Sequence, residues 1–151
     1  MDELGRTGHK IDPRGINHPR HYNNHKSGVE VIEVCRYMNF NCGSAFKYVI
    51  RRGEKLESGQ TVSQSIAKDL DKAIWYLCDD AKHEAPYKEL FRFQGQQALR
   101  KFKESEDNEH VRMFMLMLGT YCMVGGLAEL GRAVEAVRLL KIENQKVLTN
   151  P

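Results

Sequence analysis

The stretch Gly43 to Lys55 reads GSAFKYVIRRGEK, and its pattern predicts a short amphipathic helix. On such a helix Lys47, Arg51 and Lys55 recur at i, i+4 and i+8, so their side chains share one face. Three apolar residues lie on a different face: Phe46, Val49 and Ile50. The stretch therefore predicts a helix that is basic on one side and packs against the rest of the protein on the other.

Small residues indicate the ends of this helix. Gly43 and Ser44 are expected to open it with backbone amides that an anion can approach, and Gly53 is expected to end it after two arginines. Two interpretations remain open. The stretch is either an ordinary surface helix whose arginines complement the helix dipole, or part of an anion-binding site.

The segment from Val29 to Met38 also predicts an amphipathic helix. Its apolar residues recur at i, i+3, i+4 and i+7: Val31, Val34, Cys35 and Met38. Only a few residues connect it to the basic helix, so the two helices are expected to pack as a hairpin or a corner. Glu30 lies off the apolar stripe and is close in sequence to the basic face.

After a polar loop, Thr61 and Gln64 fit a capping box that begins the next helix. This helix has the clearest apolar stripe in the chain: Ile66, Leu70, Ala73, Ile74, Leu77 and Ala81. Asp69, Lys72 and Tyr76 share a second face at i, i+3 and i+7. They form either a surface ion pair beside a half-buried tyrosine, or the wall of a polar pocket that also holds the cations of the basic helix.

Three more helices are expected in the second half of the chain. Their markers are Tyr87, Phe91, Ala98 and Phe102 in a helix after Pro86, the apolar run Met113 to Val124, and the inward-facing Leu127, Leu130, Val134 and Val137 of a helix from Leu127 to about Lys146. A polar turn at residues 105–108 and the pair Gly125-Gly126 are expected to separate them. The apolar run is typical of a helix in the core or in an oligomer interface.

No segment has a strand pattern of comparable strength, so we expect an all-α fold, a compact bundle of about five or six helices. Residues 1–20 have no apolar period and predict a flexible N-terminal arm. Residues 21–82 are expected to form one helical module. Residues 83–151 are expected to extend it within the same compact domain and to provide homo-oligomer contacts.

Composition excludes several classes of protein. The 151 residues fit one domain, and 23 basic against 20 acidic residues leave a net charge of +3, which is too small to indicate nucleic acid as a partner. The four cysteines form no CxxC pair and no secretory signal precedes them, so reduced thiols in a cytoplasm are expected. The most apolar run is too short to span a bilayer, so no membrane partner is expected.

Several residues of the first half stand in a fixed order: His21-Tyr22, Gly28, Glu30, Ile32, Asn41, Gly43-Ser44-Ala45-Phe46-Lys47-Tyr48, Arg51, Lys55, Asp69-Leu70, Lys72-Ala73 and Trp75-Tyr76-Leu77. This order resembles the SaV-like family of small bacteriophage proteins, which includes a phage nucleotide kinase that lacks a Walker motif. Ser44 departs from the family pattern, which commonly has asparagine there. The resemblance implies a phage-encoded, nucleotide-binding protein in the cytoplasm of an infected cell.

A nucleotide needs fixed cations for its phosphates and an aromatic surface for its base. Residue chemistry and resemblance together imply the catalytic residues Lys47, Arg51 and Asp69, and the nucleotide-binding residues His21, Tyr22, Glu30, Lys47, Tyr48, Arg51, Lys55, Lys72 and Tyr76. Lys47 and Arg51 would contact and stabilise the phosphates, and Glu30 or Asp69 would position a hydroxyl or a metal. Mg²⁺ is the cofactor that a nucleotide would bring with it.

Three functions remain open. The first is a nucleoside monophosphate kinase, which would not be a P-loop enzyme because GxxxxGK[ST] is absent from the sequence. The second is a protein that holds a nucleotide, or a nucleotide-derived signal, without converting it. The third is a metal-dependent all-α nucleotide pyrophosphohydrolase, with Glu30, Glu33 and Asp69 as ligands. A zinc site formed by the histidines His18, His21 and His25 is a further alternative, and DNA binding ranks below these functions.

Overall fold

The computed structural model describes residue 16 and residues 19–22, 25–83 and 89–149. Its helical elements are, in chain order, η1 (Arg20–Tyr22), α1 (Val31–Cys35), α2 (Phe40–Arg51), α3 (Val62–His83), η2 (Glu89–Arg92), α4 (Gln94–Ser105), α5 (Glu109–Val124) and α6 (Leu127–Thr149). These described residues include no strand, so the expected all-α bundle is confirmed. Most of the expected N-terminal arm, and Tyr87, lie outside the described residues.

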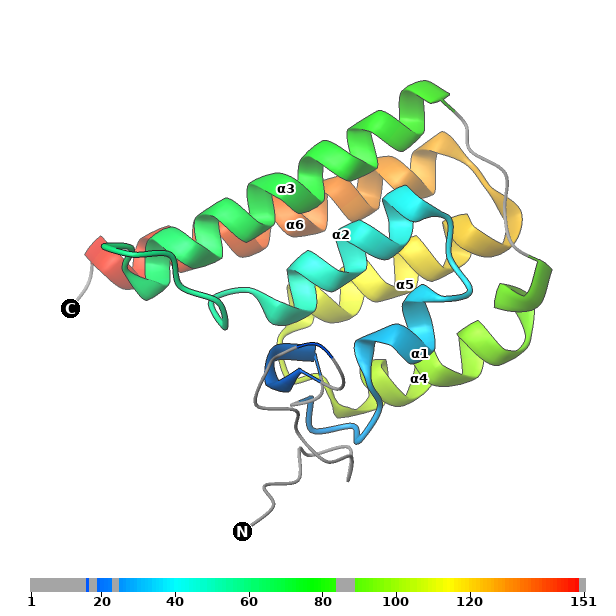
Figure 1. Ribbon diagram of the computed structural model, residues 1–151. Helices are drawn as coiled ribbons and strands as arrows, with labels where there is room; N and C mark the ends of the chain where they lie inside the picture. Colours follow the sequence, from blue (N-terminus) through cyan, green and yellow to red (C-terminus); the bar gives the residue numbers. More distant parts are fainter. Residues whose placement is uncertain (1–15, 17–18, 23–24, 84–88, 150–151) are drawn as a thin grey trace, which may run out of the picture.

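The long helices α3 and α6 run side by side, with α2 beside α3 and α5 packed along α6 (Figure 1). The short α1 contacts both α2 and α4. The helices before and after residue 83 therefore pack against one another rather than forming separate bodies. This arrangement leaves one face of α2 and one face of α3 next to each other, and these two faces carry the candidate site.

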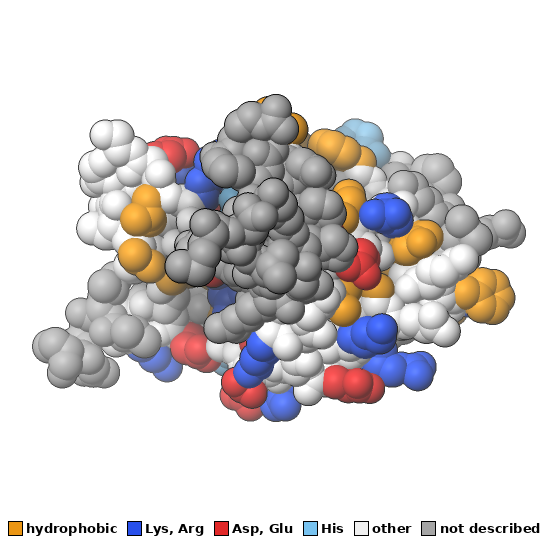
Figure 2. Space-filling model, turned by 60° about the horizontal axis from the view of Figure 1, so that its bottom comes forward, with side chains coloured by type: hydrophobic (Ala, Val, Ile, Leu, Met, Phe, Trp, Pro, Cys, Tyr) orange, Lys and Arg blue, Asp and Glu red, His pale blue; other side chains and the backbone are white. Residues whose placement is uncertain are grey.

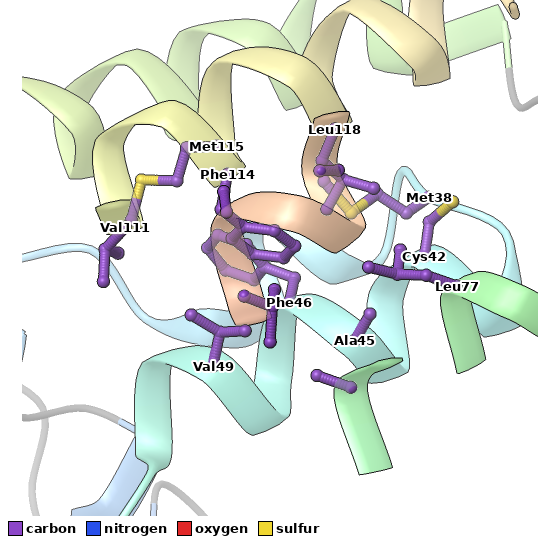
Figure 3. Packing of buried hydrophobic residues seen from close by; sticks show 14 of the residues in the cluster. Met38, Cys42, Ala45, Phe46, Val49, Leu77, Val111, Phe114, Met115 and Leu118 are labelled. Carbon is purple, nitrogen blue, oxygen red and sulfur yellow. The ribbon is translucent and has the colours of Figure 1, made fainter. Parts of the chain in front are cut away.

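One apolar core joins the helices (Figure 3). Phe46 of α2 is fully buried and meets the ring of Phe102 of α4 edge to face, with centroids 5.3 Å apart. Val49 of α2 and Phe114 of α5 are also fully buried. The expected apolar side of the basic helix is therefore confirmed, and burial of these side chains against α4 and α5 fixes α2 in the bundle.

The start of α2 differs from the expectation. Asn39 caps the helix, and its Oδ1 accepts a hydrogen bond of 2.8 Å from the amide of Cys42. Gly43 and Ser44 lie inside the helix, and the Gly43 amide donates to the carbonyl of Asn39 at 2.9 Å. The prediction that Gly43 and Ser44 open the helix was wrong. The physical reason is that Asn39 caps the helix and the helix already begins at Phe40. The Gly43 amide therefore donates within the helix and is not open to an anion.

A buried polar network fixes this start against two other helices. The side-chain amide of Asn39 donates to Asp80 of α3 at 3.1 Å, and the hydroxyl of Tyr121 of α5 donates to the same carboxylate at 2.5 Å. Gly43 permits the close approach of α1, because a Cβ at this position would lie 3.4 Å from the carbonyl oxygen of Cys35. The N-terminal half of α2 is therefore held by α1, α3 and α5 together.

The end of α2 confirms one prediction and contradicts another. Gly53 follows the helix with φ +77°, a conformation that glycine adopts without strain, and a Cβ there would lie only 2.8 Å from Ile66. The helix ends at Arg51, so Lys55 lies in the following loop rather than on the helical face that holds Lys47. The expected i+8 position of Lys55 was wrong because the glycine ends the helix first.

Other helix limits agree more closely with the sequence. The capping box is confirmed: the Gln64 side chain accepts from the Thr61 amide at 2.9 Å, and the Thr61 hydroxyl accepts from the Gln64 amide at 3.1 Å. Gly125 and Gly126 both have positive φ and separate α5 from α6, as expected. Three details were wrong. The α1 helix is shorter than residues 29–38, and Phe91 lies in the separate short helix η2 rather than in α4. Leu127 is 60% exposed because it occupies the first position of α6.

Candidate functional site

Three basic side chains converge on the ring of Tyr48. Lys47 Nζ lies 4.5 Å from the ring centroid, Arg51 Cζ lies 4.6 Å from it, and Lys72 Nζ lies 5.0 Å from it. Lys47, Tyr48 and Arg51 come from α2 and Lys72 comes from α3, so the packing of these two helices creates the group. Each contact is of the cation–π type.

Asp69 supplies the carboxylate of this group, which we call the Tyr48 cluster (Lys47, Tyr48, Arg51, Asp69 and Lys72). Its Oδ1 lies 3.3 Å from Arg51 Nη2, and both side chains are buried. Three cations therefore meet one carboxylate at this place. Of the two alternatives for this face of α3, the surface pair of Asp69 with Lys72 was wrong, because the side chain of Asp69 points toward α2 and pairs with Arg51 in a buried position.

The buried ion pair is incomplete. Arg51 donates through Nη1 to the hydroxyl of Tyr22 at 3.5 Å, but its buried Nε has no hydrogen-bond partner among the described residues. Within the same part of the chain, the Oδ2 atom of Asp69 also lacks a partner of hydrogen-bond geometry, although the nearby amide of Gly53 favours its ionised form. Buried polar atoms are usually satisfied, so an unmatched donor and acceptor in one pair mark this site as unusual.

The charges of the cluster perturb the titratable groups around it. Burial, followed by the fields of Arg51, Lys55 and Lys47, lowers the pKa of His21. Burial and the field of Arg51 also lower the pKa of Lys47. Burial raises the pKa of Asp69, and the fields of Arg51 and Lys72 oppose that rise. The site therefore has an excess of positive charge in a partly desolvated position, which favours an anion.

Aromatic side chains of α2 and α3 adjoin the cluster. The rings of Tyr48 and Tyr76 stack with centroids 5.9 Å apart, and Phe40 and Trp75 each meet Tyr76 edge to face. Phe40 is 77% exposed and Trp75 is 60% exposed. The Tyr48 ring is already surrounded by its own neighbours, whereas Phe40 and Trp75 present aromatic surface to solvent.

A groove of about 890 Å³ adjoins the cluster. Its lining comes from the N-terminal segment, α1 and the start of α2, and includes Tyr22, Glu30, Ile32, Phe40, Ser44 and Lys47. Lys47 belongs to both the groove and the cluster, and Tyr22 lines the groove and contacts Arg51 of the cluster. Hydrophobic, basic and acidic side chains lie interspersed on the face turned forward in Figure 2.

The structure brings most of the predicted site residues to one place. Lys47, Tyr48, Arg51, Asp69 and Lys72 form the cluster, and Tyr22 and Tyr76 contact it. His21 lies beside Tyr22, with ring centroids 4.1 Å apart. Glu30 is buried at the groove rather than at the cluster, and exposed Lys55 acts on His21 through its charge.

Sequence reasoning missed the groove and its aromatic residue Phe40. The signal was present in Asn39, a preferred N-cap residue directly before an aromatic residue. A helix that begins at residue 40 puts Phe40, Ser44, Lys47 and Arg51 on one face at i, i+4, i+7 and i+11. Moving the predicted start by three residues would therefore have connected the cations with the groove.

The structure also tests the two alternative metal sites. Within the described segments, no group of three or more His, Cys, Asp or Glu side chains is arranged to hold a metal ion. Glu33 accepts a hydrogen bond from the Glu30 amide at 3.1 Å, and His25 contacts Ser27 at 2.8 Å and Glu106 at 3.2 Å. His18 lies outside the described residues. Glu30, Glu33 and Asp69 are therefore not assembled as a ligand set.

Comparison with known proteins adds one finding. Residues 16–78 match a family model described as a protein of unknown function, DUF3310. The matched segment runs from the N-terminal side of the groove through most of α3, so it contains both the groove and the Tyr48 cluster. No curated protein and no solved structure matches the chain. No helix in the described part of the chain is long and apolar enough to cross a membrane.

Proposed function

We propose that the protein binds a nucleotide and that the Tyr48 cluster holds its phosphate groups. The observation that carries the proposal is the convergence of three cations on one tyrosine ring, with the carboxylate of Asp69 paired to one of them, Arg51. Like charges held together repel one another, and a polyphosphate removes that repulsion when it binds. Charge-assisted hydrogen bonds from Arg and Lys to phosphate oxygens are among the strongest in proteins.

The three cations suit different parts of this task. Arg51 is held between Asp69 and Tyr22, so its guanidinium is fixed before the ligand arrives. Lys47 and Lys72 are half-buried point charges on flexible stems, which can follow a phosphate group as it moves. In this arrangement Asp69 is a positioning residue that orients Arg51.

We propose phosphoryl transfer to a nucleoside monophosphate as the activity, in line with the resemblance to a phage nucleotide kinase. An oxygen of the acceptor phosphate would attack the terminal phosphorus of a nucleoside triphosphate, and the bond from that phosphorus to its bridging oxygen would break. Two nucleoside diphosphates result. The cluster would stabilise charge on the transferred group, and Mg²⁺ would accompany the donor. A phage origin and action in the cytoplasm of an infected cell belong to the same proposal.

The test is a binding and product screen with nucleoside mono-, di- and triphosphates, with and without Mg²⁺. The variants are Lys47→Met and Lys72→Met, with Lys82→Met as control because Lys82 is exposed at the other end of α3. Each cluster variant is expected to weaken nucleotide binding about tenfold, the loss of one charge-assisted contact, and the control is expected to bind normally.

The outcomes separate the three functions. Two diphosphates formed from a monophosphate and a triphosphate support the kinase. Binding without turnover supports a protein that sequesters nucleotides, and pyrophosphate released from a triphosphate alone supports the pyrophosphohydrolase. Unchanged binding in both cluster variants contradicts the proposed site.

We also propose that the protein self-associates through the outer face of α5 and α6. Large apolar side chains are exposed on these two helices: Met113, Leu116, Val124, Leu127, Leu139 and Ile142. On α6, the exposed side chains of Arg132 and Glu135 have opposite charges and lie between Leu127 near the start of the helix and Leu139 and Ile142 further along it. An antiparallel pairing of two α6 helices would place Arg132 beside Glu135 of a second copy and Leu139 beside its Ala128.

A further inference from the structure

We infer that the groove beside the Tyr48 cluster binds the nucleoside half of the ligand whose phosphates lie on the cluster. The inference rests on the proposed function and adds a second subsite to it. It assigns recognition of base and sugar to residues that lie outside the cation cluster, chiefly Phe40, Ile32, Ser44 and Glu30. A ligand with both an aromatic base and a phosphate group would then bind much better than either part alone.

The first argument is continuity between the groove and the cluster. Lys47 lines the groove, and its Nζ lies 4.5 Å from the centre of the Tyr48 ring. Tyr22 also lines the groove, and its hydroxyl accepts a hydrogen bond from Arg51 at 3.5 Å. A phosphate held by Lys47 and Arg51 is therefore next to the groove, so a group joined to that phosphate can extend into it.

The second argument is the size and the chemistry of the groove. Its volume of about 890 Å³ is at the upper end of the usual range for small-molecule sites, about 300 to 1,000 Å³. Its walls are largely apolar, with Val31, Ile32 and Met38 from the α1 region. The aromatic rings of Tyr22 and Phe40 complete a lining that suits a flat base better than a second phosphate.

The third argument is the position of polar groups on the groove wall. The Ser44 hydroxyl lies one helical turn before Lys47, and Glu30, the N-cap residue of α1 whose carboxylate also accepts from the first turn of that helix, lines the groove from the α1 side. A hydroxyl both donates and accepts hydrogen bonds, and a carboxylate accepts them from sugar hydroxyls or from base N–H groups. These groups give the groove a means to select a nucleoside over a simple apolar ligand.

The test compares a nucleoside triphosphate with inorganic pyrophosphate by calorimetry. Phe40→Ala removes an aromatic ring that is 77% exposed, so the variant is expected to fold normally. Phe93→Ala is the matched control, because Phe93 is 68% exposed and does not line the groove. Loss of one stacked base typically costs about tenfold or more in affinity, so we expect that loss for the nucleotide with Phe40→Ala. Pyrophosphate affinity is expected to stay unchanged in both variants.

A second variant tests the groove by filling it. Ile32→Trp adds bulk at the groove wall from a side chain that is already 52% exposed, and it is expected to weaken nucleotide binding without affecting pyrophosphate. Normal nucleotide affinity in both Phe40→Ala and Ile32→Trp overturns the inference and leaves the cluster proposal standing. If the wild-type protein binds neither nucleotide nor pyrophosphate, the proposed function itself is overturned, and the inference with it.

Discussion

Replacing Lys72 with methionine is predicted to leave the fold as stable as before, or more stable, while it weakens phosphate binding. Methionine keeps most of the apolar stem and removes the charge. Replacing a side chain that serves only the fold usually destabilises the protein. Replacing a residue that serves a ligand often stabilises it, because such a residue can be unfavourable for the fold when no ligand is bound. Stability and affinity should therefore move in opposite directions at Lys72.

The magnitude follows from the geometry around Tyr48. Lys47, Arg51 and Lys72 lie 4.5, 4.6 and 5.0 Å from one ring centroid. Any two of these charges are therefore less than about 10 Å apart, where repulsion per pair is about 0.4 kcal/mol in water and about 1.7 kcal/mol at an effective dielectric constant of about 20. The substitution removes two such repulsions, about 1 to 3 kcal/mol in total.

Two losses oppose this gain. The cation–π contact with Tyr48 is worth about 0.5 to 1 kcal/mol at a partly exposed site. The attraction to Asp69 is also lost, because the charge of Lys72 stabilises the ionised form of that carboxylate. The net expectation for Lys72→Met is a free energy of unfolding that is unchanged or raised by up to about 1 kcal/mol at low salt. This gain should shrink at about 1 M salt, where charges are screened beyond about 3 Å.

The assay is urea unfolding followed by circular dichroism, combined with pyrophosphate titration. Lys68→Met is the control, because Lys68 lies one turn earlier on α3 and pairs with Glu57 at 2.7 Å on the surface. It is expected to lose less than about 1 kcal/mol of stability and no pyrophosphate affinity. The reasoning is refuted if Lys72→Met loses more than about 1 kcal/mol of stability and binds pyrophosphate as the wild type does.

The remaining predictions concern pH and assembly. The lowered pKa of His21 means that the contribution of this residue to stability is full above the ordinary histidine pKa of 6.5 and is lost as pH falls through the lowered pKa. An anion on the cluster offsets the fields of the three cations, so pyrophosphate is expected to raise the pKa of His21 in an NMR titration; an unchanged pKa with pyrophosphate bound would place the anion elsewhere. In light scattering after size exclusion, we expect the wild type to be a dimer, Leu139→Glu a monomer and the control Phe93→Glu a dimer. A monomeric wild type would remove the proposed interface.

The helices that the sequence predicted well depend on short-range physics. The capping box at Thr61 and Gln64 joins groups only three residues apart, and the positive φ of Gly53 is available to glycine wherever it occurs. The apolar stripe of α3 packs against the core as its period indicates, with Leu70 and Leu77 fully inaccessible and the remaining residues of the stripe buried or partly buried. Such signals are readable because both partners lie within one or two helical turns.

The parts that were wrong depend on longer-range contacts or on a stronger competing local signal. The start of α2 was placed at Gly43, yet Asn39 caps the helix and is tied to Asp80, which lies 41 residues away. The predicted position of Lys55 failed because Gly53 ended the helix first. A face of a helix can be predicted from its period, but the residue at which the helix begins is decided by competing caps.

The candidate site also combines features that the sequence predicts with features that only the tertiary structure determines. From the sequence alone, Lys47 and Arg51 could be assigned to one helix face, and Asp69 and Lys72 to another, because helical period determines which side chains share a face. The tertiary structure decided that the two faces meet, that Asp69 pairs with Arg51 and that the cations surround Tyr48. It also created the groove, which no local pattern encodes. The reason is that a charge cluster and a groove depend on how α1, α2 and α3 pack, and that packing is fixed by the shared core and not by any one helix.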